Sequence, residues 1–190
     1  MKYFAWPRWH RHSIRLKGFD YAQPGMYFVT ICARNKEWLF GEIQDGKMEL
    51  NEWGRIVEKC WYEIPKHFEH VSLNEFVIMP NHVHGIISIH SSRNHVGARH
   101  AVPLPKNRKF AGAIPGSLST IIGSFKSAAT KRINESLLLD HMNPWQRNFY
   151  EHIIRNMKDL NRIRTYIKEN PAHWENDEEF TPATQSADRY

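Results

Sequence analysis

Two apolar segments that meet at Pro80-Asn81 constrain the fold of this 190-residue chain more than any other feature. Residues 73–79 and 82–90 are rich in apolar side chains, and the Pro-Asn pair between them marks a tight connection. We therefore predict two adjacent strands, the second of which opens with His82 and His84. Residues two apart in a strand point to the same face, so the two imidazoles are expected about 6–7 Å apart at their Cα atoms. This arrangement suits one metal ion, although a His-x-His pair can also be two polar residues on a half-exposed strand.

Hydrophobic periodicity and capping residues give the order of the remaining elements. Besides the two strands above, we expect a strand at 26–33, a hairpin at 39–50, a helix from 51 to Pro65, a helix from Ser117, a strand at 145–154 and a helix from Asn156 to about Asn170. Without the hairpin, the first six elements match the α+β, ferredoxin-like (split βαβ) pattern, and a C-terminal helix follows. This pattern is an antiparallel sheet with helices on one face. Its central neighbours would be strands 26–33 and 82–90, which places the histidines at mid-sheet.

Length and composition indicate one folded unit between two tails. A chain of this length can bury a sizeable core, and no apolar run approaches membrane-spanning length, so we expect no membrane partner. Cys32 and Cys60 each fall inside a predicted element, which indicates reduced core thiols and a cytoplasmic protein. We predict a basic arm at residues 1–24, a single domain at 25–174 with a long loop at 91–116, and an acidic, flexible tail at 175–190.

The net charge of +6 is unevenly distributed along the chain. Residues 76–134 contain no Asp or Glu, and neither do the first 19 residues. Such acid-free stretches predict a positive surface, and the interleaved aromatic residues Trp6, Trp9 and Phe110 favour nucleic acid as its partner over a merely solvated basic loop. The basic residues between 76 and 134, which we predict to contact nucleic acid, are Arg93, Arg99, Lys106, Arg108, Lys109, Lys126, Lys131 and Arg132.

The last predicted helix can complete a metal site. Tyr166 and Asn170 are four residues apart, so they lie one above the other along an edge of the apolar stripe, with Arg162 one turn earlier on the same line. From there a phenol and an amide oxygen can reach a metal that the sheet holds. Without the histidines, these would be ordinary residues of an amphipathic helix that ends before Pro171.

In combination, these residues resemble a known family. Residues 79–84 (Met-Pro-Asn-His-Val-His), Trp145-Gln146-Arg147, Glu151-His152, Tyr166-Ile167 and Asn170-Pro171 form an ordered set that resembles the REP-associated tyrosine transposases. These are bacterial relatives of the single-tyrosine insertion-sequence transposases in the HUH endonuclease superfamily, and the resemblance spans roughly residues 10–174. It implies a ferredoxin-like catalytic domain that nicks and rejoins single-stranded or hairpin DNA by means of one tyrosine and a divalent metal.

The resemblance also implies a role for each site residue. His82 and His84 would bind the metal, Mg²⁺ or Mn²⁺, with Asn170 as the third ligand. Tyr166 would be the nucleophile and would form a 5′-phosphotyrosine. Arg162 is expected to contact DNA and to help activate the phenol.

Three functions stay open on the sequence alone. The first is a DNA-nicking transposase that acts as a monomer or homodimer. A non-catalytic DNA- or RNA-binding protein on the same scaffold is the main alternative, and a metal-dependent hydrolase that uses water is the third. Within the first function Tyr150 is a rival nucleophile, which we assign to packing or to DNA contact.

Overall fold

The structure, a computed structural model, describes residues 20–91, 114–138 and 142–182. Its main sheet has four antiparallel strands in the order β4-β5-β1-β6. These strands are β1 (Gly25–Cys32), β4 (Val71–Met79), β5 (His82–Ile89) and β6 (Tyr150–Ile154). The predicted α+β class, the antiparallel sheet and the central pairing of β1 with β5 are confirmed.

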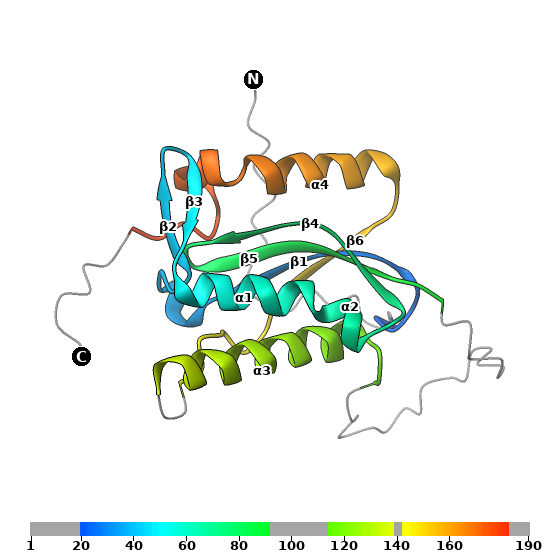
Figure 1. Ribbon diagram of the computed structural model, residues 1–190. Coiled ribbons are helices and arrows are strands. Elements are labelled where there is room, and N and C mark those ends of the chain that lie inside the picture. The colour runs from blue at the N-terminus through cyan, green and yellow to red at the C-terminus, as the bar shows by residue number, and fades with distance from the viewer. Residues whose placement is uncertain (1–19, 92–113, 139–141, 183–190) are drawn as a thin grey trace.

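Helices cover both faces of this sheet (Figure 1). The helices α1 (Glu52–Tyr62), α2 (Ile64–His67) and α3 (Leu118–Leu137) lie on one face, and α4 (Met157–Glu169) lies on the other. The other described elements are a hairpin of β2 (Gly41–Gln44) and β3 (Lys47–Leu50) and the 3-10 turns η1 (Arg34–Lys36) and η2 (Pro171–Asn176). The predicted C-terminal helix is α4. No helix among the described residues combines the length and the apolar character that a membrane crossing requires.

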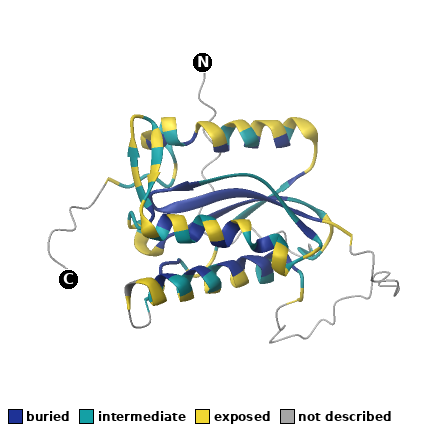
Figure 2. Ribbon diagram, viewed as in Figure 1, coloured by how far each residue is buried: buried dark blue, intermediate teal, exposed yellow. Residues whose placement is uncertain are grey.

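The sheet is buried on both sides because its strands carry two alternating apolar sets (Figure 2). On β1, Tyr27 and Val29 belong to the larger core together with Trp61 of α1. Phe28 lies between them in sequence, points the other way and packs with Ile163 of α4. All eight residues of β5 are buried. The even-numbered residues of β5, which include both histidines, therefore face α4.

The three long helices begin at the predicted capping residues, whose side-chain oxygens accept a backbone N–H of the first turn. These pairs are Asn51 with Gly54, Ser117 with Thr120 and Asn156 with Asp159. The prediction that Pro65 ends the first helix is wrong, since α1 ends at Tyr62. Pro65 lies in the first turn of α2, where its missing N–H costs no hydrogen bond.

The strand predicted at 145–154 is shorter than expected. It begins only at Tyr150, and Trp145 forms an isolated bridge to the residue after β1. The reason lies in α3, because Nζ of Lys126 donates to the carbonyl oxygens of Gln146 and Asn148 at 2.8 and 2.9 Å. These carbonyl oxygens accept hydrogen bonds from a lysine and not from a neighbouring strand. Residues 146–149 are therefore not part of the strand.

Two smaller predictions are confirmed. The hairpin turns at Asp45 and Gly46, whose φ angles of 49° and 72° suit a two-residue turn between antiparallel strands.

The two cysteines are reduced core thiols, as predicted: Cys32 and Cys60 are both free and buried.

The close approach of α1 to β5 generates a stability test at Gly85. A Cβ at this position would lie 2.3 Å from Cζ2 of the buried Trp61 ring. Gly85→Ala therefore forces the indole to move, and we expect the free energy of unfolding to fall by about 1–3 kcal/mol. Gly123→Ala is the matched control, because a Cβ there meets nothing within 4 Å and alanine favours a helix. Denaturant unfolding measures both variants, and equal stabilities would contradict the packing described here.

Candidate active site

His82 and His84 lie side by side on the face of the sheet that α4 covers. Their ring centroids are 4.2 Å apart, and only 0% and 2% of their surfaces are exposed. The pairing of β5 with β1 places them opposite Cys32 and Thr30. The prediction that both rings share one face is confirmed. Their burial excludes the alternative of two polar residues on a half-exposed strand.

The hydrogen bonds around His82 leave its Nε2 atom with a free lone pair. Its Nδ1 lies 2.8 Å from Oδ1 of Asn81, an atom that can only accept, so Nδ1 carries the proton. Asn81 is oriented for this role because its Nδ2 donates to the carbonyl of Glu179 at 2.8 Å. Burial and, next, the neighbouring His84 hold the pKa of His82 well below its usual value, so the ring is neutral. Its buried Nε2 has no hydrogen-bond partner among the described residues.

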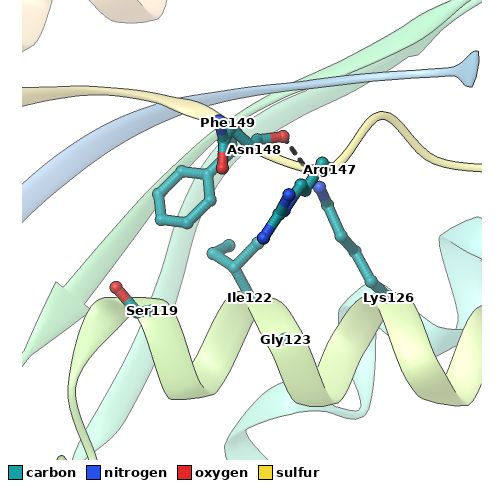
Figure 3. Close-up of a pocket in the computed structure, with 7 residues that line it drawn as sticks. All are labelled: Ser119, Ile122, Gly123, Lys126, Arg147, Asn148 and Phe149. Atoms are coloured by element: carbon teal, nitrogen blue, oxygen red, sulfur yellow. Dashed lines mark hydrogen bonds between the residues drawn. The ribbon is translucent and has the colours of Figure 1, made fainter. Parts of the chain in front are cut away.

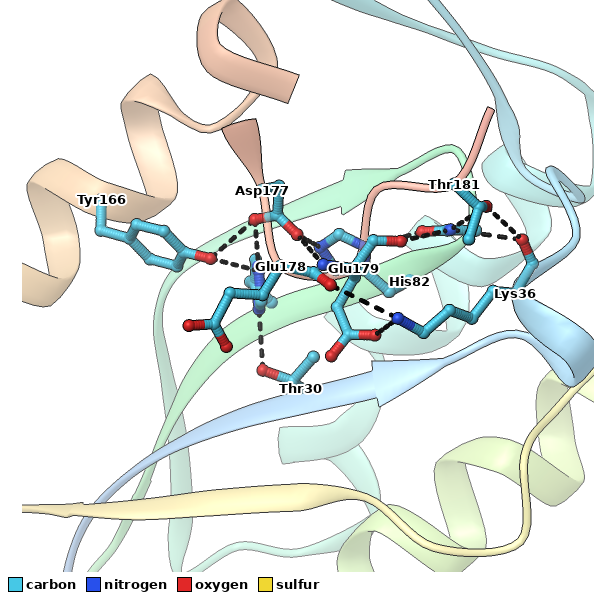
Figure 4. Close-up of polar contacts among 10 residues, drawn as sticks. Thr30, Lys36, His82, Tyr166, Asp177, Glu178, Glu179 and Thr181 are labelled. Atoms are coloured by element: carbon cyan, nitrogen blue, oxygen red, sulfur yellow. Dashed lines mark hydrogen bonds and ion pairs between the residues drawn. The ribbon is translucent and has the colours of Figure 1, made fainter. Parts of the chain in front are cut away.

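His84 connects the sheet to Tyr166 of α4. Its Nδ1 lies 2.9 Å from Oγ1 of Thr30, and its Nε2 lies 3.0 Å from Oη of Tyr166. The tyrosine ring packs edge-on against Phe28, with 6.1 Å between the centroids. This packing holds the phenol over the histidines (Figure 4).

A carboxylate that the sequence analysis missed completes the cluster. Oδ2 of Asp177 accepts hydrogen bonds from Oη of Tyr166 at 2.7 Å and from Nδ2 of Asn170 at 2.6 Å. The same oxygen is 3.6 Å from Nε2 of His84, and Oδ1 is 4.0 Å from Nε2 of His82. Burial acts to raise the pKa of Asp177, but hydrogen bonding to His84 and the nearness of His82 outweigh burial, so the pKa lies below its usual value. Asp177 is therefore ionised at neutral pH.

The two predicted residues of α4 both reach this cluster. Burial and, next, the Asp177 carboxylate raise the pKa of Tyr166 above its usual value, so the phenol is protonated at neutral pH. Asn170 is the C-cap of α4 and is 3% exposed. Its Nδ2 is used by Asp177, and its buried Oδ1 has no hydrogen-bond partner among the described residues.

The segment that carries Asp177 is fastened over the histidines (Figure 4). Nζ of Lys36 pairs with Glu179 at 2.7 Å, and Nε1 of Trp38 donates to the carbonyl of Thr181 at 2.9 Å. The predicted domain end at 174 and the flexible acidic tail are therefore wrong for residues 175–182, and residues 183–190 lie outside the described part of the chain. The only sequence signal was an acidic residue soon after Asn170-Pro171, in a stretch without periodicity.

The chemistry of the cluster fits a divalent cation. Ligand atoms of His82, His84 and Asp177 all lie within 4.8 Å of one another, and all three residues are buried. The orphaned Oδ1 of Asn170 offers a fourth ligand beside them. Imidazole, carboxylate and amide donors together suit a divalent metal ion.

Arg162 does not pair with the tyrosine that it was expected to activate. Its guanidinium pairs with Asp159, one turn earlier on α4, at 2.5 Å. Asp159 also binds Nε2 of His152 of β6 at 2.9 Å. Arg162 thus belongs to a charged group at the start of α4, and Asp177 is the partner to which Tyr166 donates. The DNA contact of Arg162 stays a prediction.

The residues predicted to bind DNA fall into two groups. Five of them, Arg93, Arg99, Lys106, Arg108 and Lys109, lie outside the described residues, as does the basic arm up to residue 19. On α3, Lys126 binds backbone carbonyls and Arg132 pairs at 2.6 Å with Glu63, the residue after α1, whereas the side chain of Lys131 is 76% exposed. Of these three side chains, Lys126 and Arg132 are thus bound within the protein and Lys131 extends into solvent. Their DNA contacts stay predictions.

The rival tyrosine is farther from the histidines. Tyr150 is opposite Thr30 in the pairing of β6 with β1, and Thr30 is opposite His84 in the pairing of β1 with β5. Tyr150 thus shares the histidine face but is separated from His84 by a whole strand, whereas Oη of Tyr166 is 3.0 Å from His84.

The chain is similar in sequence to one known protein and similar in fold to a solved structure. No protein-family model matches the chain. An uncharacterized protein of Haemophilus influenzae is 43% identical over 176 residues, which cover 89% of this chain and 92% of that protein. The solved structure of a REP-associated tyrosine transposase bound to a REP hairpin aligns with a TM-score of 0.51 and 19% identity, over 89% of this chain and 74% of that one. The second similarity is one of fold.

The ligand assignment generates a metal-binding test. Asp177→Asn removes the one anionic ligand but preserves the shape of the side chain, and we expect the Mn²⁺ affinity to fall at least about tenfold. His82→Ala and His84→Ala should each weaken it further, because each removes a nitrogen ligand. His67→Ala, at an exposed position of α2, is the matched control for loss of an imidazole. Isothermal titration calorimetry on folded variants measures the affinities, and an unchanged Mn²⁺ affinity in all three site variants would refute the ligand set.

Proposed function

The chain belongs to the same family as the Haemophilus influenzae protein and has the fold of a REP-associated tyrosine transposase, and we propose that it is an HUH-type single-tyrosine DNA endonuclease. It nicks single-stranded DNA, keeps the 5′ end as a phosphotyrosine and rejoins that end to a 3′-hydroxyl. Such strand transfer is the chemistry of a transposase. It needs a divalent cation and no nucleotide hydrolysis, because the covalent intermediate conserves the energy of the broken bond.

One juxtaposition carries this proposal. The hydroxyl of Tyr166 is 3.0 Å from His84, and the adjacent His82 is neutral with a lone pair that no described residue uses. If Tyr166 had only a packing role, its hydroxyl would not need to lie beside two imidazoles that can bind a metal ion. Activated nucleophiles lie within hydrogen-bond reach of groups that hold their proton or charge, as this phenol does.

The chain's own residues supply the nucleophile and a proton acceptor. Oη of Tyr166 attacks phosphorus, an O–P bond forms, and the bond between phosphorus and the 3′ oxygen breaks, so that the 3′ end leaves and takes a proton from solvent. The phenolic proton leaves along the 2.7 Å hydrogen bond to Oδ2 of Asp177. Because the pKa of this carboxyl lies below its usual value, Asp177 passes the proton on to solvent and stays ionised. In rejoining, an incoming 3′-hydroxyl gives its proton to solvent and attacks the phosphotyrosine, the bond between phosphorus and Oη of Tyr166 breaks, and the phenolate takes up a proton from solvent.

Three residues fix the geometry of this step. Phe28 holds the tyrosine ring, and Thr30 and Asn81 orient the two imidazoles. Such supporting hydrogen bonds set which ring nitrogen faces the site. A cation bound by the histidines and Asp177 would act as a Lewis acid that stabilises negative charge on the phosphate.

The proposed substrate is hairpin DNA with unpaired nucleotides at the site of cleavage. Two observations support it: the fold is that of a transposase solved with a REP hairpin, and the acid-free stretches of the sequence carry many basic residues. Glu179 and Thr181 bind Asn81 beside the histidines. Residues 178–181 therefore have to shift before a phosphate can reach the phenol, whereas Asp177 keeps its hydrogen bond to Tyr166.

Removal of a single oxygen tests the nucleophile. Tyr166→Phe should abolish the covalent protein–DNA adduct while DNA affinity stays within about twofold, because only the attacking atom is lost. Tyr150→Phe is the matched control and should keep the adduct. The assay incubates labelled hairpin DNA with Mn²⁺ and separates the products on a denaturing gel. Adduct formation by the Tyr166 variant and not by the Tyr150 variant would reverse the assignment.

The same gel separates the alternative functions. Free nicked DNA without an adduct would indicate a hydrolase that uses water. Bound but intact DNA would indicate a non-catalytic nucleic-acid-binding protein.

A further inference from the structure

A pocket of about 260 Å³ opens between α3 and the chain segment that leads into β6 (Figure 3). Its described lining consists of Ser119, Ile122, Gly123, Lys126, Arg147, Asn148 and Phe149. Small-molecule sites begin at about 300 Å³, so the pocket suits one compact unit and not an extended ligand. Arg147 and Phe149 point toward α3 (Figure 3), and Phe149 packs against the larger core, on the side of the sheet opposite the histidines.

The lining combines positive charge with an aromatic ring. Arg147 is exposed and Lys126 is partly buried, and none of the described residues that line the pocket is acidic. Glu151, the next acidic residue along the chain, lies in β6 outside this lining. Phe149 and Ile122 add apolar surface, and Asn148 adds a donor and an acceptor for hydrogen bonds. A nucleotide has a matching set of features: an anionic phosphate, a flat base that stacks on aromatic rings, and a base edge that forms hydrogen bonds.

Lys126 builds the pocket wall. Its Nζ donates to the carbonyls of Gln146 and Asn148, which draws the segment toward α3 and sets the positions of the side chains on either side. Burial lowers the pKa of Lys126 to about 8, so the ammonium is still mostly charged at neutral pH. Gly123, one turn before Lys126 on α3, leaves the helix side of the pocket open, since even a Cβ there would meet nothing within 4 Å.

The pocket lies close to the catalytic face although it opens on the other side of the sheet. The backbone N–H of Gln146 donates to the carbonyl of Cys32, and Cys32 is opposite His82 in the pairing of β1 with β5. Two strand spacings, or about 10 Å, thus separate the backbone of the pocket segment from that of His82. A single DNA strand that passes over the sheet edge beside β6 can reach both places.

We propose that this pocket is a second DNA-binding site, which takes one unpaired nucleotide of the substrate with its base against Phe149 and its phosphate on Arg147. The inference rests on the proposed DNA function and adds to it. The site holds the strand that flanks the hairpin while the neighbouring phosphate lies at Tyr166.

Equilibrium binding in EDTA, which prevents cleavage, tests the pocket. The probes are a fluorescent hairpin with an unpaired flank and the same hairpin without it, each measured by anisotropy across a salt series. Phe149→Leu keeps an apolar side chain but removes the ring, and should weaken binding of the flanked hairpin about fivefold or more without a change in salt slope. Arg147→Gln should flatten the slope of log K against log salt by about 0.7, because one phosphate contact is lost.

Lys59→Gln is the matched control, since it removes one positive charge from an exposed position on α1 and should change neither quantity. Both pocket variants should bind the hairpin without a flank as the wild type does. The proposal is overturned if both variants bind the flanked hairpin normally, or if they lose as much affinity for the hairpin without a flank. Because Arg147 is exposed, its variant tests the pocket even if Phe149→Leu is poorly folded.

The adduct assay separates this proposal from the catalytic one. An adduct at Tyr166 together with normal DNA binding by both pocket variants overturns the pocket and leaves the nuclease. Flank-dependent losses without any adduct support the pocket and overturn the nuclease. A wild-type protein that binds neither hairpin overturns both.

Discussion

The register between β1 and β5 is the constraint on which the rest of the structure depends. In this register Thr30 and Cys32 lie opposite His84 and His82. A slip of one residue would turn both imidazoles away from α4 and into the apolar core against α1 and α3. Gly85 reinforces the register, because Trp61 fills the place where any side chain on that face would lie. One pairing therefore serves the core on one face and the polar cluster on the other.

Burial gives this polar cluster its chemical character. A buried polar atom without a partner costs about 1–3 kcal/mol, and two such atoms, Nε2 of His82 and Oδ1 of Asn170, occur in one cluster. Ordinary core polar groups avoid that cost, whereas a cation would satisfy both atoms at once. The same burial keeps His82 neutral, and hydrogen bonding keeps Asp177 ionised, so each group is in the protonation state in which it can bind a metal.

The cluster also joins three distant parts of the chain. The sheet supplies the histidines, α4 supplies Tyr166 and Asn170, and the segment after η2 supplies Asp177. That last segment is secured by contacts to the stretch that follows β1, through Glu179 and Thr181. The site is therefore complete only when the C-terminal segment lies in place against the sheet and α4.

Local patterns in the sequence determined much of this protein. Alternation along β5 put His82 and His84 on one face, the four-residue spacing on α4 put Tyr166 and Asn170 on one edge, and side-chain caps set the helix starts. Each of these follows from backbone geometry over a few residues. The resemblance to a family then assigned roles that the spacing alone left open.

Tertiary structure alone decided the rest. Asp177 joins His82 across 95 positions of sequence, from a segment whose acidic, aperiodic composition predicts only a solvated tail. Likewise Lys126 and Arg162, both expected to contact DNA, bind within the protein. Lys126 donates to two backbone carbonyl oxygens, and Arg162 pairs with Asp159. A charged side chain binds the partner that folding brings within its reach, and that partner is not encoded in the spacing of its own element.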